Sequence, residues 1–192
     1  DAVKTIIGVH RVANQMSELI GGRITHPITI IPGGFSQVPT VKQLKELKET
    51  LKAQVEPLLG IVDVVKSVAE NLPAFERDTE YVSLKQDGVY TFYHGDIGST
   101  DGKVKPVSEW ESVANEYVSN QSTAKWAKWN RESYAVGALA RFNNNAELLS
   151  PLGKKVAEMF GLEKGCCSPF MNNVAQLAEC AHVVEASIGI ID

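Results

Sequence analysis

The side chains best suited to metal or nucleophilic chemistry are few in this sequence and widely separated. The cysteines are Cys166, Cys167 and Cys180, and the histidines are His10, His26, His94 and His182. Two cysteines hold one metal ion when their spacing lets both sulfurs reach it, as in CxxC, and no CxxC occurs here. Adjacent cysteines point their side chains apart. The sequence therefore predicts no metal site and no catalytic residue within these 192 residues.

Motifs for nucleophilic catalysis and for phosphate binding are also missing from the sequence. There is no GxSxG elbow, and GGFSQ is not a phosphate-binding loop. His10 and His182 fall in helical patterns, which indicates surface or packing positions. His94, in TFYHGD, is interpreted as a loop residue rather than a base.

His26 is harder to dismiss, because of the segment that contains it. Residues 21–40 read GGRITHPITIIPGGFSQVPT, an apolar, glycine-punctuated stretch between two helical patterns. A residue before proline is biased toward an extended backbone, and imidazole donates hydrogen bonds and changes charge near neutral pH. On the residues alone, a packing role for His26 is favoured over a functional one.

Composition limits the class of protein. The chain is 44% hydrophobic and 22% charged, with a net charge of -4. These values are typical of a globular protein with a core, and they argue against nucleic-acid binding, which needs a basic face. We find no run of eighteen apolar residues, so no transmembrane segment is expected, and no signal peptide is visible. The odd number of cysteines suits a reducing compartment, and the first residue, Asp1, indicates a piece of a larger protein.

Apolar residues at helical spacing predict a mainly α chain with a single domain. The expected helices lie at about 5–20, 41–69, 109–118, 151–161 and 169–188. Thr40 with Gln43 and Ser108 with Glu111 form capping-box patterns. Ser150-Pro151 and Ser168-Pro169 each place a good N-cap before a proline. Pro57 should kink or split the pattern over 41–69.

A small antiparallel β insert is expected around residues 80–107. Residues 81–84 and 89–93 are rich in β-branched and aromatic side chains, and a turn sequence at 86–88 separates them. This pattern predicts a hairpin. A second turn, at Asp101-Gly102, separates residues 97–99 from 104–107. Trp126 and Trp129 are placed in a polar connection.

Three stretches, in order, resemble segments of nickel–iron hydrogenase large subunits. GGRITHPITIIPGG, after a helix carrying RVANQMSELI, resembles the "GG–HP–GG" segment of that family. YHGDIGSTDGKV resembles a hairpin region with "Y-x-G" followed by a turn around "D-G". YAVGALARFNNN, residues 134–145, looks like "Y-x-V-G-x-L-A-R-x-N". Each match is short, but their order and spacing cover nearly the whole chain.

This resemblance implies a mainly helical scaffold with small β elements. Members of the family interconvert hydrogen with protons and electrons at a nickel–iron centre held by two CxxC motifs, one near each end of the subunit. They pass electrons to iron–sulfur clusters in a separate small subunit. Neither motif occurs in this chain. It is therefore expected to be the central fragment of a large subunit, inactive alone and binding no cofactor itself, with the iron–sulfur small subunit as partner.

The resemblance also implies roles for particular residues. A place facing the cluster or the small-subunit interface is expected for His26, Arg23, Gly33 and Gly34. Structural roles are expected for Tyr134, Gly137, Arg141 and Asn143. For Arg141 the residues themselves agree, because an arginine among small apolar residues usually pairs with a carboxylate or carbonyls to fix packing.

Two alternatives remain open. The related scaffold subunit of respiratory complex I carries a similar histidine loop without nickel ligands, and a free-standing helical binding module could share the loop pattern. The HP dipeptide and VGALAR favour the hydrogenase, and GGR favours its cytoplasmic groups over periplasmic enzymes with GGKNPHP. As a fragment, the chain should expose apolar patches and self-associate.

Overall fold

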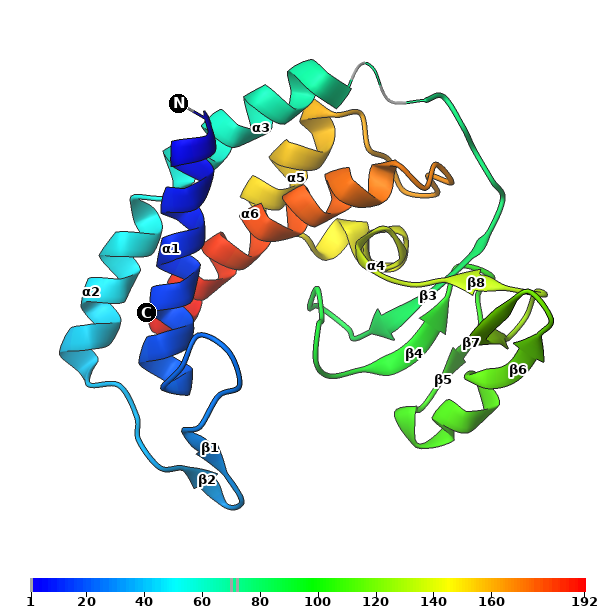
Figure 1. Ribbon diagram of the computed structural model, residues 1–192, viewed down its shortest axis with the longest axis horizontal. Coiled ribbons are helices and arrows are strands. Elements are labelled where there is room, and N and C mark those ends of the chain that lie inside the picture. Colours follow the sequence, from blue (N-terminus) through cyan, green and yellow to red (C-terminus); the bar gives the residue numbers. More distant parts are fainter. Residues whose placement is uncertain (1, 70, 72) are drawn as a thin grey trace. The chain divides into compact units, whose positions relative to one another are not determined.

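The computed structural model describes residues 2–69, 71 and 73–192, which form two compact units (Figure 1). The first unit holds residues 2–69 with 181–192, and the second holds residues 71 and 73–180. The expectation of a single domain from the sequence stays a prediction. Close to half of the described residues are helical and the sheets are small, in rough agreement with a mainly α scaffold.

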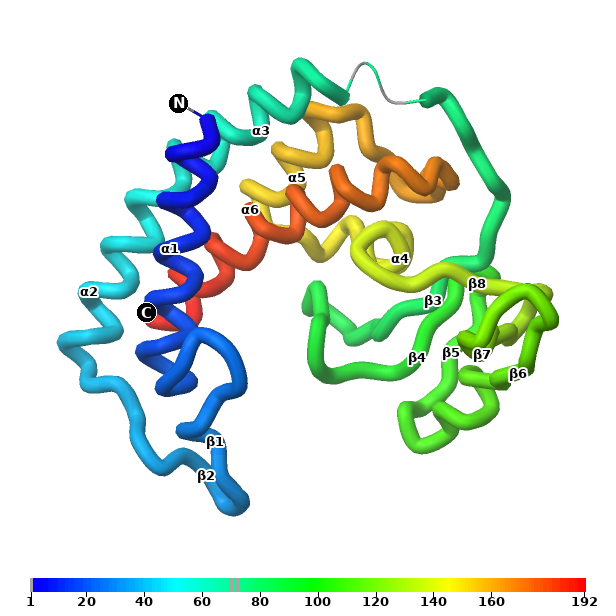
Figure 2. Tube along the Cα trace, in the orientation of Figure 1, coloured from blue at the N-terminus to red at the C-terminus, as the bar shows by residue number. Residues whose placement is uncertain are grey.

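The first unit is built from helices and one short hairpin. Its elements are α1 Ala2–Gly21, β1 Ile30–Ile31, β2 Gly34–Phe35, α2 Val41–Lys52, α3 Val55–Ala69 and the last part of α6 Met171–Ile191. Buried Val12, Leu47 and Leu51 form a core between α1 and α2, against which Ile188 and Ile191 of α6 pack. Figure 2 follows the chain from α1 through the hairpin into α2.

Helix boundaries in this unit follow the expected caps with one difference. Gly22, at φ +75°, ends α1, as its ease in the left-handed region predicts. Thr40 and Gln43 form the expected capping box of α2. The break between α2 and α3 lies at residues 53–54, not at Pro57, which instead occupies the first turn of α3, where its missing N–H has no partner to lose.

The second unit contains a four-stranded sheet in the order β5-β4-β3-β8. The strands are β3 Glu80–Lys85, β4 Asp96–Ser99, β5 Val104–Lys105 and β8 Tyr134–Ala135. β3 pairs antiparallel with β4 and parallel with β8. The helices are α4 Ala138–Asn145, η2 Ala146–Leu148, α5 Pro151–Met159 and the first part of α6. Ser150 caps α5 as expected, and α6 begins at Met171, two residues later than its proline predicted.

The expected hairpin of residues 81–84 with 89–93 is wrong. β3 pairs with β4 instead, and only an isolated bridge joins Gln86 to Val89. The reason lies in tertiary packing. Tyr90 and Thr91 are only 3% and 4% exposed, so their segment packs in the interior of the unit and does not pair with β3.

The expected helix at 109–118 is also wrong. The chain forms a short 3-10 helix, η1 Val107–Ser112, and then the antiparallel pair β6 Asn115–Ser119 with β7 Ser122–Lys128. β7 contains Trp126, which the sequence had placed in a connection. β-Branched and aromatic residues at 117–118 find cross-strand partners in β7, and this pairing overrides the local helix start signal.

One described helix, α6, is long and apolar enough to cross a membrane by length and composition. Within the second unit it buries Val174, Ala175 and Ala178 in the protein and carries Glu179 in an ion pair.

Candidate functional site

The loop that contains His26 leaves α1 and returns to its end. The N–H groups of Ile28 and Thr29 both donate to the carbonyl of Gly21, with N···O distances of 2.8 and 3.3 Å. The Thr29 hydroxyl donates to the carbonyl of Ile20 at 2.6 Å, and Thr29 is buried. Carbonyls that a helix end leaves without partners are thus satisfied by the returning chain. This folds residues 22–28 into a fixed protrusion.

His26 lies at the exposed turn of this protrusion with φ +56°. The extended backbone expected before Pro27 is therefore not found. A left-handed histidine is uncommon but is enriched over most other residues there. The reversal that brings Thr29 back to α1 lies between Gly22 and Pro27, where Gly22 and His26 both have a positive φ. Arg23 is also exposed on this protrusion.

Gly33 and Gly34 form the tip of the β1–β2 hairpin. Ile31 pairs with Gly34, so Pro32 and Gly33 are the two central turn residues. Gly33 has φ +92°, which a proline–glycine turn of type II requires. The surface around both turns is apolar. Five side chains are exposed by 46% to 61% of their area: Ile24, Ile28, Ile30, Ile31 and Phe35. We call these five residues the loop patch.

Arg141 belongs to the second unit. The sequence led us to expect a carboxylate or carbonyls as its partner, and the structure shows a carboxylate. Its guanidinium donates to both oxygens of Glu179, Nε to Oε1 at 2.6 Å and a terminal nitrogen to Oε2 at 2.8 Å. Tyr90 donates its hydroxyl to Oε1 at 2.8 Å, and the Phe92 ring lies 5.3 Å from the guanidinium carbon. The Glu179 hydrogen bond raises the pKa of Arg141, and burial raises the pKa of Tyr90, with the Glu179 charge adding to it.

Asn143 and its two neighbours tie α4 to two other segments, the loop at 165–166 and β3. Asn143 donates to the carbonyl of Cys166 at 2.9 Å and accepts from the Gly165 N–H at 2.9 Å. Asn144 donates to the carbonyl of Tyr81 at 3.2 Å, and Asn145 donates to that of Leu84 at 3.0 Å. All three asparagines are buried, and the amides of Asn144 and Asn145 bind carbonyls of β3.

Gly137 begins α4 in a conformation with φ +98°, which a side chain would strain. It has no side chain to cap the helix, and Asn172 of α6 does so instead, accepting from the Leu139 N–H at 3.1 Å. Tyr134 is half-buried in β8. Burial raises its pKa, and the nearby carboxylate of Glu80 adds to this.

Glu80 is a buried carboxylate that no sequence pattern predicted. It is fully buried and accepts hydrogen bonds from Ser99, from Asn130 through both its amides and from the Arg131 N–H, at distances of 2.6 to 3.1 Å. Glu179 was missed as well. The sequence did contain a sign of its role, because Glu179 is an acidic residue among Ala175, Ala178 and Ala181 on a helix face that is otherwise small and apolar.

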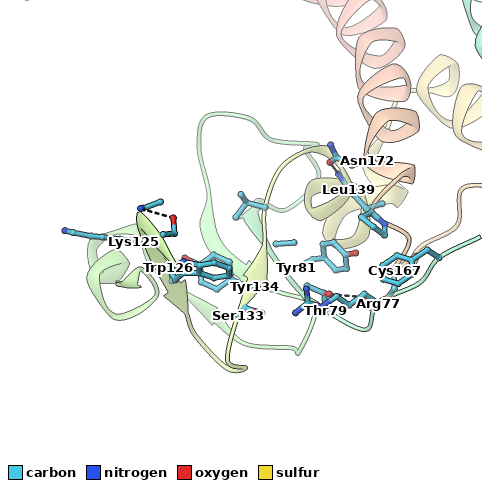
Figure 3. Close-up of a pocket in the computed structure, with 17 residues that line it drawn as sticks. Arg77, Thr79, Tyr81, Lys125, Trp126, Ser133, Tyr134, Leu139, Cys167 and Asn172 are labelled. Carbon is cyan, nitrogen blue, oxygen red and sulfur yellow. Dashed lines mark hydrogen bonds between the residues drawn. The ribbon is translucent and has the colours of Figure 1, made fainter. Parts of the chain in front are cut away.

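A hollow of about 690 Å³ opens on the second unit beside β7 and β8 (Figure 3). Trp126 and Tyr134 lie together on one side, and Tyr81, Thr79 and Arg77 lie across from them. The other lining residues are Phe75, Ser122, Ala124, Lys125, Ala127, Ser133, Ala135, Val136, Leu139, Cys167, Pro169 and Asn172. We call this cavity the aromatic hollow.

A metal centre does not fit the residues present. Across the described parts of the chain, no group of three or more His, Cys, Asp or Glu side chains is placed to hold a metal ion. Burial raises the pKa of the Cys166 thiol, which opposes the thiolate state that metal binding requires. No step of hydrogen chemistry can be derived from these residues.

Comparison with known proteins extends the resemblance found in the sequence. The alpha subunit of sulfhydrogenase 1 from Pyrococcus furiosus is 27% identical over 192 residues, covering 99% of this chain and 44% of that protein. One subunit of the F420-non-reducing hydrogenase vhu from Methanococcus voltae is 30% identical over 182 residues, covering 84% of this chain and 43% of that protein. No family model matches the chain.

A solved structure gives the fold. The chain resembles a chain of an NAD+-reducing [NiFe]-hydrogenase, solved in the H2-reduced state, with a TM-score of 0.79 and 16% identity, over 98% of this chain and 47% of that one. The expected likeness to hydrogenase subunits and to their scaffold is thus confirmed. The chain spans less than half the length of the curated relatives that it matches.

Proposed function

We propose that this chain is the central part of the large subunit of a nickel–iron hydrogenase, whose complete form interconverts hydrogen with protons and electrons. One observation carries the proposal: the similarity runs along 99% of this chain but only 44% of the sulfhydrogenase alpha subunit. The matched region includes the loop at 21–34 and the segment 134–145, in the family's order. Taken alone, these 192 residues are expected to be inactive, because neither CxxC motif occurs in them.

The loop patch supports a partner for this part of the subunit. Five large apolar side chains stay exposed around His26, Gly33 and Gly34, and a contiguous exposed apolar surface usually marks an interface. The partner in this proposal is an iron–sulfur small subunit, with His26 and Arg23 facing its cluster. A histidine there tunes a cluster through hydrogen bonding and charge, as groups around metal sites do in general.

The same exposed surface gives a second expectation for the isolated chain. Without its partner and the remaining parts of the subunit, it self-associates through the loop patch. The parent enzyme is proposed to be cytoplasmic, an assignment that is supported by the GGR sequence of residues 21–23 and by three unpaired cysteines.

Metal analysis of the full-length gene product tests the proposal. We expect nickel and iron bound to the purified protein, CxxC motifs on both sides of the present residues, and hydrogen uptake with an artificial electron acceptor. A full-length product that lacks both CxxC motifs and binds no nickel would overturn it. That outcome would favour a non-catalytic scaffold of the complex I type.

A further inference from the structure

Two strand edges in the second unit have no partner strand among the described residues. β7 pairs with β6 on one side only, and β8 is the last strand of the order β5-β4-β3-β8. Each of these edges carries backbone N–H and C=O groups that no described strand satisfies. Edges of this kind are templates for another extended segment.

Both edges border the aromatic hollow. The lining includes the consecutive residues 124–127 of β7 and the consecutive residues 133–136 in and beside β8. The side chains of successive strand residues point to opposite faces of the sheet. When consecutive residues all line one cavity, the strand therefore presents its edge to that cavity rather than one face. Four residues of a strand extend over about 13 Å, which is room for a short added strand.

The wall opposite Trp126 is built from one face of an extended segment. Phe75, Arg77, Thr79 and Tyr81 line the hollow, and the residues between them do not. Alternate side chains therefore point into it. Arg77 has no hydrogen-bond or ion-pair partner for its guanidinium among the residues that the structure describes. This wall offers aromatic surface and one cation.

The β6–β7 pair needs support from another element. A two-stranded sheet by itself is marginally stable in water, and within this one Tyr117, Val118 and Trp126 are exposed. A strand added along β7 would bond its edge and cover Trp126.

We infer that an extended segment of the same parent subunit, from outside these 192 residues, inserts between β7 and β8 as an added strand. It joins the two-stranded and four-stranded sheets, with apolar side chains against Trp126 and Tyr134 and an acidic side chain opposite Arg77. The inference rests on the proposed function for the existence of such chain, because the relatives are more than twice as long as their matched part.

Amide hydrogen exchange tests the insertion. The full-length gene product is compared with the present 192-residue chain. Those amides of Ser122–Lys128 that do not bond to β6, and those of residues 133–136 that do not bond to β3, should exchange about tenfold or more slowly in the full-length protein, because an added strand protects them. Asp96–Ser99, already paired on both sides by β3 and β5, should exchange equally in both and so reports that the unit is folded. Equal exchange at β7 and β8, with β4 protected in both, would overturn the inference.

A matched pair of tryptophan variants in the full-length protein adds a second test. Trp126→Ala removes aromatic surface from the hollow and should restore most of the fast exchange at β8. Trp110→Ala removes a tryptophan of similar exposure, 54% against 44%, that does not line the hollow, and should leave that exchange unchanged. Slow exchange at β8 in both variants would contradict a strand packed on Trp126. These outcomes are independent of nickel content, so this inference and the proposed function can fail separately.

Discussion

The guanidinium of Arg141 and the carboxylate of Glu179 face each other through two hydrogen bonds of 2.6 and 2.8 Å. The pair joins α4 to the first part of α6, and the Tyr90 hydroxyl completes it from a third segment. Glu179 is buried and Arg141 is less than one-third exposed. A buried charge pair changes the free energy of unfolding little while both partners are present. Removing one partner destabilises the protein strongly, because the other charge stays buried without a counterion.

Glu179→Gln should therefore destabilise the second unit. The change leaves the Arg141 charge without its counterion, and we expect the free energy of unfolding to fall by about 3 kcal/mol. Tryptophan fluorescence in urea measures this, because Trp110, Trp126 and Trp129 all belong to the second unit. Glu147→Gln, which breaks the exposed pair with Lys164, is the control and should cost less than about 1 kcal/mol. Similar losses in the two variants would contradict a special role for the buried pair.

Asn143→Asp should weaken the contact between α4 and the loop at 165–166. In the native protein the carbonyl of Cys166 accepts a hydrogen bond from the Asn143 amide nitrogen. In the variant a carboxylate oxygen faces that carbonyl instead. We expect a loss of about 2 kcal/mol, the cost of leaving a buried acceptor without its donor, measured by the same urea titration. Asn173→Asp, at an exposed position near the start of α6, is the matched control and should be neutral. Equal stability of both variants would show that the Asn143 amide is not needed.

Alkaline pH should destabilise the second unit partly through Tyr90. Its pKa is raised in the folded state by burial and by Glu179. The folded protein therefore holds a proton that the unfolded chain releases near its ordinary pKa of about 10. Stability is fully present below that pH and is lost as pH rises above it. Tyr90→Phe should be less stable at neutral pH but show a shallower loss between about pH 9 and 11, measured by urea unfolding at each pH. Parallel pH profiles for the two proteins would rule out this contribution.

Gly22→Ala should destabilise the first unit. Gly22 has φ +75°, and a Cβ atom there would lie 2.9 Å from the Thr29 side chain that fixes the His26 loop. We expect a loss of more than about 1 kcal/mol in the free energy of unfolding, followed by circular dichroism. Gly8→Ala in the middle of α1, where a Cβ meets nothing within 4 Å, should instead stabilise the helix by about 1 kcal/mol. The opposite signs separate the conformational demand at Gly22 from general helix propensity.

His26→Ala in the full-length protein should slow electron transfer and leave the nickel content unchanged. The prediction follows from the exposed, fixed position of His26 beside the loop patch and rests on the proposed function. Hydrogen-dependent reduction of an acceptor gives the rate, and redox titration gives the cluster potentials. His10→Ala, an exposed histidine on α1, is the control. Unchanged kinetics with unchanged potentials would remove His26 from electron transfer.

Local sequence signals determined the parts of the structure in which neighbours along the chain decide the outcome. The Thr40 capping box, the serine cap before Pro151 and the glycine end of α1 lie where the sequence indicated. The motif residues of the resemblance could be named from the sequence, and for Arg141 a carboxylate or carbonyl partner was expected. These features depend on backbone conformation or on a residue's own chemistry, which are visible over a few residues.

Only the tertiary structure decided which distant segments pair. The partner of β3 is β4 rather than residues 89–93, because Tyr90 is buried and donates a hydrogen bond to Glu179, 89 residues away in the sequence. Residues 115–119 became a strand because β7 offered a matching edge, although Ser108 and Glu111 signalled a helix. Glu179 could be recognised as the partner of Arg141, and Glu80 as a buried acceptor, once the fold had brought their donors together. Local patterns set where elements begin and end, but the free energy gained from long-range pairing and burial decides between alternatives that are locally equal.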